Sequence, residues 1–161
     1  MAPRLPQRTT KTVFAETGFS LIELMMVVAI LSLIAGIAIP VYNGYVTEAR
    51  MGKMIMDIRA MDIPLKDYVV ENGVAAPSLA AVGFDGELDA WGRPFQYHPI
   101  AGMGKNPVCR KDKNLHPINS DFDLYSLGED GQSNLPLTAK ASHDDIIRAN
   151  DGAYLGLARD Y

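Results

Sequence analysis

The chain has 161 residues, which is enough for one domain with a modest hydrophobic core. Its net charge of −4 and its lack of a basic stripe exclude an electrostatic nucleic-acid-binding protein, because affinity for phosphate backbones comes mainly from a surplus of Lys and Arg. The only cysteine, Cys109, excludes an intramolecular disulfide, so an exported domain of this sequence must be stabilised by packing or by a metal ion.

The first predicted element is an apolar helix from Phe19 to Ile39. Its strongly polar members are Ser20, Glu23 and Ser32, and its length of roughly 32 Å is sufficient to cross a bilayer. The segment before it carries more basic than acidic residues. By the positive-inside rule, we expect the N-terminus in the cytoplasm and the C-terminal part of the chain on the other side of the membrane.

A small residue, Gly18, stands directly before the apolar run. An ordinary secretory signal has its cleavage site after the apolar core and loses that core on cleavage. Here the order is reversed, so cleavage between Gly18 and Phe19 removes residues 1–18 and leaves the whole apolar helix on the product.

The segment "GFSLIELM", residues 18–25, resembles the processing site of the type IV pilin and pseudopilin superfamily. The resemblance implies that a prepilin peptidase cleaves after Gly18 and that Phe19 is N-methylated. It also implies that the apolar helices polymerise to form the core of a filament.

Glu23 is a carboxylate within this apolar run, where a charge costs a few kcal/mol and usually marks a paired or functional group. Cleavage creates a cationic amine at Phe19, and the amine of one subunit can meet Glu23 of the next in a stack of parallel helices. Assembly then neutralises both charges. The alternative is a glutamate that reaches the cytoplasmic interface at the start of a plain signal anchor.

A second helical pattern follows, and it predicts that the helix continues to about residue 70. Its apolar positions recur at spacings of three and four, which is the period of an amphipathic helix packed on a core. Gly36, Pro40 and Pro64 weaken this helix, so we expect bending or local melting. The positions are Met51, Met54, Ile55, Ile58, Met61, Leu65, Tyr68 and Val69.

Residues 89–98, "DAWGRPFQYH", and 121–130, "DFDLYSLGED", each combine a turn signal with an alternating or aromatic run. They predict two antiparallel strands, separated by a long connection from Pro99 to Ser120. The predicted fold class is therefore α+β, the pilin-like fold, with one long helix packed on a small antiparallel sheet. Residues 40–161 form the predicted head, which ends in a loop and a tail.

The segments "DAWGRPFQY" and "DLYSLGEDGQ" resemble the head of the major, G-type pseudopilin of type II secretion systems, in which the second segment begins a calcium loop. The constellation suits a hard cation that takes six to eight oxygen ligands. The residues that the resemblance assigns to calcium are the side chains of Asp130, Asp144 and Asp145 and the carbonyls of Leu127 and Ser142.

This chain departs from the family pattern by an enlarged loop at residues 133–141 and by a longer tail after Asp145. Asn150 and Asp151 are alternative ligands in that tail. The competing interpretation involves no metal: Asp144 and Asp145 cap a C-terminal helix, and Asp130 begins an ordinary turn.

Enzyme motifs are absent from the sequence, which contains no HExxH, no GxSxG and no phosphate-binding glycine loop. A nucleophilic pair of Cys109 and His116 is the only candidate, and their spacing gives no reason to expect contact. We therefore expect no enzymatic activity. The alternative from a different functional class is a signal-anchored periplasmic enzyme or binding protein.

The resemblance implies a structural subunit, the major pseudopilin, which polymerises into the periplasmic filament of a type II secretion system. The implied partners are copies of itself, minor pseudopilins, an inner-membrane platform protein, an assembly ATPase and the prepilin peptidase. The implied location is the bacterial inner membrane, with a single pass and a periplasmic head. The alternative is the major pilin of a type IV pilus, which serves adhesion, motility or DNA uptake.

Overall fold

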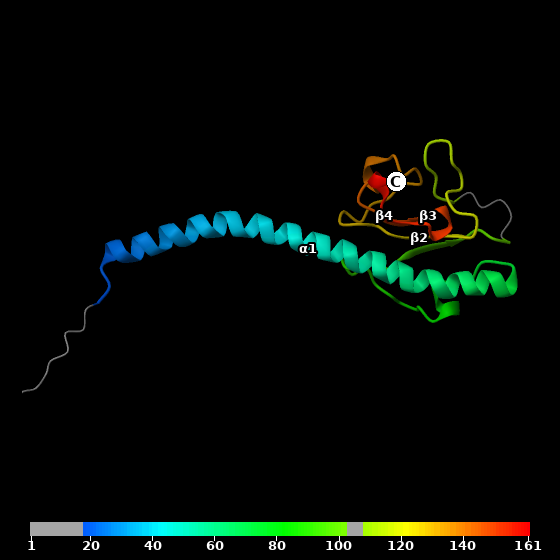
Figure 1. Cartoon of the computed structure of the whole chain (residues 1–161), viewed down its shortest axis with the longest axis horizontal. Coiled ribbons are helices and arrows are strands. Elements are labelled where there is room, and N and C mark those ends of the chain that lie inside the picture. The colour runs from blue at the N-terminus through cyan, green and yellow to red at the C-terminus, as the bar shows by residue number, and fades with distance from the viewer. Residues whose placement is uncertain (1–17, 103–107) are drawn as a thin grey trace, which may run out of the picture. The chain divides into compact units, whose positions relative to one another are not determined.

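A computed structural model describes residues 18–102 and 108–161. These residues form two compact units, one that ends at residue 42 and one that begins at residue 43. The long helix α1 (Leu21–Asn72) contributes to both units (Figure 1). Its bounds agree with the predicted helix to about residue 70. It is continuous through Gly36, Pro40 and Pro64, so the local melting that we expected is not found there.

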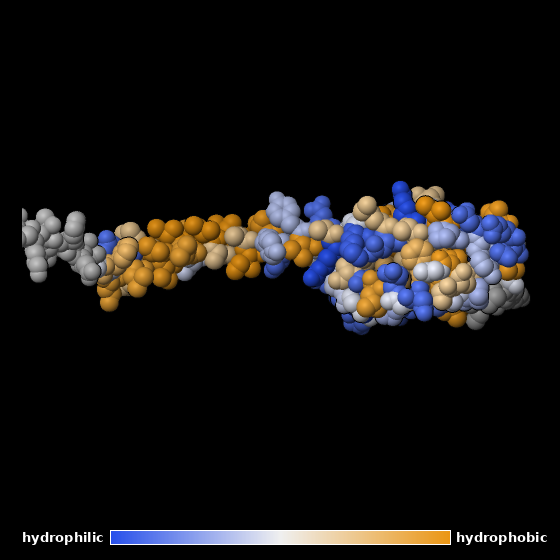
Figure 2. All heavy atoms as spheres, turned by 90° about the horizontal axis from the view of Figure 1, so that it is seen from below, coloured by the Kyte–Doolittle hydropathy of each residue, from blue (hydrophilic) through white to orange (hydrophobic). Residues whose placement is uncertain are grey.

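In the first unit, the apolar side chains of α1 face outward on all sides. Every large apolar side chain from Phe19 to Ile39 is between 47% and 87% exposed. Figure 2 shows the continuous apolar surface that they form. The helix contains a stretch that is long and apolar enough to cross a membrane. A surface of this kind needs lipid or other apolar helices around it.

The second unit, residues 43–161, corresponds to the head and contains a four-stranded antiparallel sheet. The strands lie in chain order, and each pairs with the next. They are β1 (Gln96–Pro99), β2 (Phe122–Ser126), β3 (Ile146–Ala149) and β4 (Tyr154–Leu157). The two predicted strands correspond to β1 and β2. The 3₁₀ turns are η1 (Leu79–Val82), η2 (Lys140–Ser142), η3 (Asn150–Gly152) and η4 (Ala158–Asp160).

The head part of α1 lies along one face of the sheet, as Figure 1 shows. Its stripe of Met54, Ile58, Met61 and Leu65 is at most 1% exposed and packs on side chains of β2 and β3. All eight positions of the predicted amphipathic stripe belong to this core or contact it, so the predicted packing is confirmed.

The opposite face of the sheet is covered by loops rather than by a second helix. Ile118 and Leu137 come from these loops and pack on Tyr125 and Ile147 of the sheet. Because both faces are covered, β2 and β3 are buried at every position and do not alternate between buried and exposed.

Candidate functional site

Ser20 and Glu23 form a reciprocal cap at the start of α1. The backbone N–H and the hydroxyl of Ser20 donate hydrogen bonds to Glu23 Oε2 at 2.9 and 2.8 Å. The N–H of Glu23 donates to Ser20 Oγ at 3.2 Å. This is a capping box, in which a serine and a glutamate three residues later satisfy each other's backbone groups. The sequence contains the S-x-x-E pattern of this cap, whereas the prediction for Glu23 rests only on its charge.

The predicted processing site precedes this cap. Gly18 and Phe19 lie outside α1, which begins at Leu21, and Phe19 is 87% exposed. An exposed peptide bond outside a helix is accessible to a peptidase. Cleavage, methylation and the role of Glu23 in assembly stay predictions.

In the head, the two segments that resemble a pseudopilin meet through Asp89. Its Oδ1 accepts hydrogen bonds from the N–H groups of Trp91 and Arg93 at 2.9 and 2.8 Å, which fixes the turn of "DAWGRP". Its Oδ2 accepts the hydroxyl hydrogen of Ser126 at 2.7 Å, at the start of "SLGEDG". Asp89 is 5% exposed, so these bonds lie in a buried region.

The turn that follows Ser126 brings Asp130 next to Asp144. The N–H of Asp130 donates to Asp144 Oδ2 at 2.9 Å, and Asp130 Oδ1 accepts from the N–H of Gln132 at 2.7 Å. The turn reading of Asp130 is therefore correct. The helix reading of Asp144 and Asp145 is wrong, because the following residues form β3 and β4.

Asp145, a predicted calcium ligand, instead faces a fixed cation. Its Oδ2 accepts hydrogen bonds from Arg110 at 2.7 Å and from the Ser133 hydroxyl at 2.6 Å. The side chains of Arg110 and Asp145 are 2% and 0% exposed. Burial raises the pKa of Asp145 to about 6, although the hydrogen bond from Ser133 and the charge of Arg110 oppose this shift.

The remaining predicted ligands are also engaged in protein contacts. The carbonyl of Ser142 accepts from the N–H of Asp145 at 3.2 Å. The side chain of Leu127 packs on Tyr125 and Ile147, a contact that does not involve its carbonyl. The alternative ligands, Asn150 and Asp151, accept hydrogen bonds from Tyr161 and Ser120, respectively.

The guanidinium beside Asp145 Oδ2 does not fit a calcium shell, whereas Asp145 Oδ1 is buried without a hydrogen-bond partner among the described residues. In the parts of the chain that the structure describes, no group of three His, Cys, Asp or Glu side chains is arranged to hold a metal ion. Calcium ligands are oxygens that surround the ion, whereas here a guanidinium group lies against Asp145. Calcium binding stays a prediction, and this arrangement argues against it.

The nucleophile candidate is not supported by the structure. Cys109 is 3% exposed, whereas His116 lies on the exposed surface. Burial and the nearby Asp123 carboxylate raise the pKa of the Cys109 thiol, which favours the less nucleophilic protonated form.

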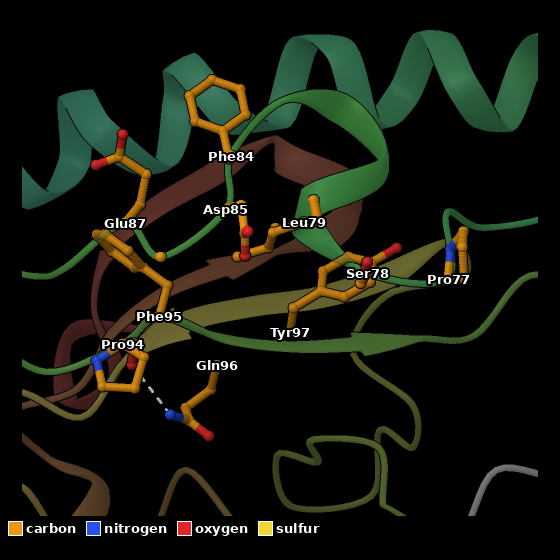
Figure 3. Close-up of a pocket in the computed structure, with 12 residues that line it drawn as sticks. Pro77, Ser78, Leu79, Phe84, Asp85, Glu87, Pro94, Phe95, Gln96 and Tyr97 are labelled. Carbon is orange, nitrogen blue, oxygen red and sulfur yellow. Dashed lines mark hydrogen bonds between the residues drawn. The ribbon is translucent and has the colours of Figure 1, made fainter.

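An open groove of about 490 Å³ runs between the loop at 77–87 and β1 (Figure 3). Its lining is mainly aromatic and apolar, and Figure 3 shows Phe95 and Tyr97 on the strand side. Asp85 and Glu87 are its acidic side chains.

Comparisons with known proteins agree with these features. A family model described as the prokaryotic N-terminal methylation motif matches residues 14–39. The type II secretion system core protein G of Pseudomonas aeruginosa is 31% identical over 138 residues, covering 73% of this chain and 86% of that protein. Core protein G of Aeromonas hydrophila is 25% identical over 139 residues, with the same two coverages.

A fimbrial protein of Neisseria meningitidis serogroup B is 33% identical over 146 residues, covering 83% of this chain and 84% of that protein. No solved structure gave a significant match. Together, the apolar anchor, the methylation motif and the helix-on-sheet head define a membrane-anchored, pilin-like protein. The chain belongs to the type IV pilin and pseudopilin superfamily and is similar to core protein G of type II secretion systems.

Proposed function

We propose that this chain is the major structural subunit of a type II secretion pseudopilus and has no catalytic role. The observation that carries the proposal is the similarity to core protein G across 86% of that protein. The head supports it, because Asp89 joins the two segments that resemble a pseudopilin. The single cysteine also favours it, because type IV pilins commonly close a C-terminal loop with a disulfide.

The subunit is processed before it assembles. The prepilin peptidase cleaves after Gly18, the new N-terminus at Phe19 is methylated, and the helix stays in the inner membrane with the head in the periplasm. Apolar surfaces of neighbouring α1 helices then replace lipid, which accounts for their exposure in the single chain. The amine of Phe19 pairs with Glu23 of a neighbouring subunit, which aligns the incoming subunit.

The filament assembles through partners that the family resemblance implies. The platform protein and the ATPase in the inner membrane add subunits, and minor pseudopilins join the filament. A fimbrial relative at 33% identity supports a second candidate function, the major pilin of a type IV pilus. The two functions differ in where the filament acts. A pseudopilus acts in the periplasm and promotes the release of other proteins, whereas a pilus is displayed outside the cell.

Deletion and complementation in the source bacterium test this choice. We expect deletion to remove exported proteins from the culture medium, and we expect a wild-type copy to restore them. Sheared surface filaments should be unchanged in the deletion strain. Loss of surface filaments with normal export would contradict the proposal and support the pilus reading. Mass spectrometry of the membrane fraction should find a chain that begins at methylated Phe19.

A further inference from the structure

Arg110 lies where its guanidinium group connects three separate segments of the head. Its Nη2 donates to Asp145 Oδ2, directly before β3, and its Nη1 donates to the Ser133 hydroxyl in the enlarged loop. Its backbone N–H donates to Asp123 Oδ2 at 2.6 Å, in β2. The guanidinium carbon lies 4.3 Å from the ring centroid of Tyr125, which adds a cation–π contact.

The enlarged loop and the connection that carries Arg110 are paired along their backbones. The N–H of Lys111 donates to the carbonyl of Leu135 at 3.1 Å, and the N–H of Leu137 donates to the carbonyl of Lys111 at 2.9 Å. The two segments therefore deliver Arg110 and Ser133 to Asp145 together. The enlargement of this loop has a specific structural consequence, because it brings the serine that contacts both charged groups.

A second contact from the enlarged loop occupies Ser142. The Ser142 hydroxyl donates to the carbonyl of Asn134 at 2.8 Å and accepts from the N–H of Asn134 at 2.9 Å. The enlarged loop thus contacts both ends of the 142–145 turn, through Asn134 at Ser142 and through Ser133 at Asp145 Oδ2. A divalent cation bound to Asp145 would also lie close to the buried guanidinium, and like charges repel strongly where water is excluded.

We propose that the guanidinium of Arg110 is a built-in cation that closes the C-terminal loop of this head in place of calcium. A guanidinium group carries its own positive charge, so Arg110 offsets the charge of the buried Asp145 without any dependence on ion concentration. Its planar guanidinium group contacts Asp145 and Ser133 at the same time. The ammonium group of a lysine is a compact and more strongly hydrated charge, so it would make this double contact less well. The head then folds in the same way in calcium-poor and calcium-rich surroundings. This inference concerns the stability of the head and is independent of the proposed function.

Thermal unfolding of the full chain in detergent micelles tests the proposal. Trp91 is the only tryptophan and lies in the head, so its fluorescence reports the unfolding of the head. The wild type is measured in chelator and in about 1 mM calcium, which matches the weak sites of extracellular proteins. Arg110→Gln and Arg110→Lys are measured in the same buffers. Arg159→Gln is the matched control, because Arg159 is exposed and pairs with Asp160 at 3.7 Å.

We expect the same Tm for the wild type in chelator and in calcium. Arg110→Gln should lower Tm by roughly 10 °C, since it leaves a buried carboxylate without its cation. Arg110→Lys should lower it less, and Arg159→Gln should leave it unchanged. A saturable rise of several degrees in the wild type with calcium would overturn the proposal. A Tm for Arg110→Gln equal to that of the wild type in chelator would also overturn it.

Discussion

The carboxylate of Asp89 accepts the hydroxyl hydrogen of Ser126 at 2.7 Å and so joins two segments of the head that are far apart in the sequence. The same carboxylate caps the turn at Trp91 and Arg93. The Ser126 hydroxyl also accepts from the N–H of Gly128 at 3.3 Å. One buried acid thus connects both segments that resemble the head of a pseudopilin.

Asp89→Ala should destabilise the head by about 2–4 kcal/mol, because three donors lose a charged acceptor in a buried region. Chemical denaturation followed by Trp91 fluorescence measures the change. Asp85→Ala is the control, because Asp85 is an exposed acid in the preceding loop. Equal stability of the two variants would contradict this account of Asp89.

Gly128 has a positive φ of 65°, and a Cβ placed there would lie 2.3 Å from the carbonyl oxygen of Asp144. Gly128→Ala should therefore destabilise the head through both backbone strain and a clash with backbone atoms. Gly86→Ala is the matched control, because Gly86 has a φ of 73° but open space around it. We expect about 1 kcal/mol for Gly86→Ala and clearly more for Gly128→Ala in the same denaturation measurement. Equal losses would show that the contact with Asp144 contributes nothing.

The sequence predicted α1, β1 and β2 because their apolar periods are strong and their turn residues are clear. It did not lead us to β3 and β4, although "IIRA" and "YLGL" flank an Asn-Asp-Gly turn that is typical of a hairpin. The family pattern assigns Asp144 and Asp145 to a calcium loop, and that assignment predicts no strands in the tail that follows.

The Arg110–Asp145 pair could not have been predicted from local sequence patterns. The partners are distant in the chain, and Arg110 stands in a connection without apolar periodicity. Asp62, in contrast, can be recognised from the sequence as unusual, because it is a charged residue within the buried stripe of α1. A charge at such a position requires a partner, but the identity of that partner depends on how the sheet packs on the helix.

Arg148 is that partner, and it links α1 to the sheet. Its Nε donates to Asp62 Oδ1 at 2.5 Å, and its Nη2 donates to Asp121 Oδ2 at 2.5 Å. The guanidinium carbon lies 4.0 Å from the ring centroid of Phe122, and the Arg148 side chain is fully buried. These contacts place one cation between two carboxylates at the interface of helix and sheet.

Arg148→Met should cost about 3–5 kcal/mol of stability, because it removes the buried cation between the buried Asp62 and the half-buried Asp121 and leaves Asp62 with only the exposed Lys66. Lys66→Met is the matched control, because Lys66 pairs with the same Asp62 at 2.9 Å but its side chain is 39% exposed. We expect at most about 1 kcal/mol for the control, as for other exposed ion pairs. Urea denaturation of the two variants should separate these values, and similar losses would contradict the central role of Arg148.

Asp151 predicts a pH dependence of stability. Partial burial raises its pKa, but hydrogen bonds from the N–H and hydroxyl of Ser120 lower it, and the net shift is downward from 3.8. A depressed folded-state pKa gives stability that is present above pH 3.8 and is lost as the pH falls through the folded-state value.

Asp151→Asn should therefore be less stable than the wild type near neutral pH, and the difference should shrink as the pH falls below 3.8. Asn tolerates the positive φ of 53° at this position, so the variant tests the charge rather than the backbone. Thermal melting from neutral pH down to about pH 3 measures the effect. Asp160→Asn, at an exposed residue, is the control. A difference that stays constant over this range would show that the charge of Asp151 does not stabilise the head.

Glu23 has two separable roles, and a pair of variants distinguishes them. The cap needs only an acceptor that can reach Ser20, and a glutamine side chain provides one. The proposed pairing with the amine of Phe19 needs the negative charge. Glu23→Gln should therefore keep the start of α1 but reduce filament assembly strongly. Ser20→Ala should cost about 1 kcal/mol at the helix terminus and leave assembly intact.

Chemical cross-linking between subunits and export, measured in the same strains, give the readout, because the proposed filament lies in the periplasm. Immunoblots of the membrane fraction check that both variants are inserted and processed. If only the cap matters, the order reverses: Glu23→Gln assembles normally and Ser20→Ala is defective. The charge account would then be wrong. Normal assembly of both variants would mean that neither role limits polymerisation, and the burial of apolar α1 surface would be sufficient to hold the subunits together.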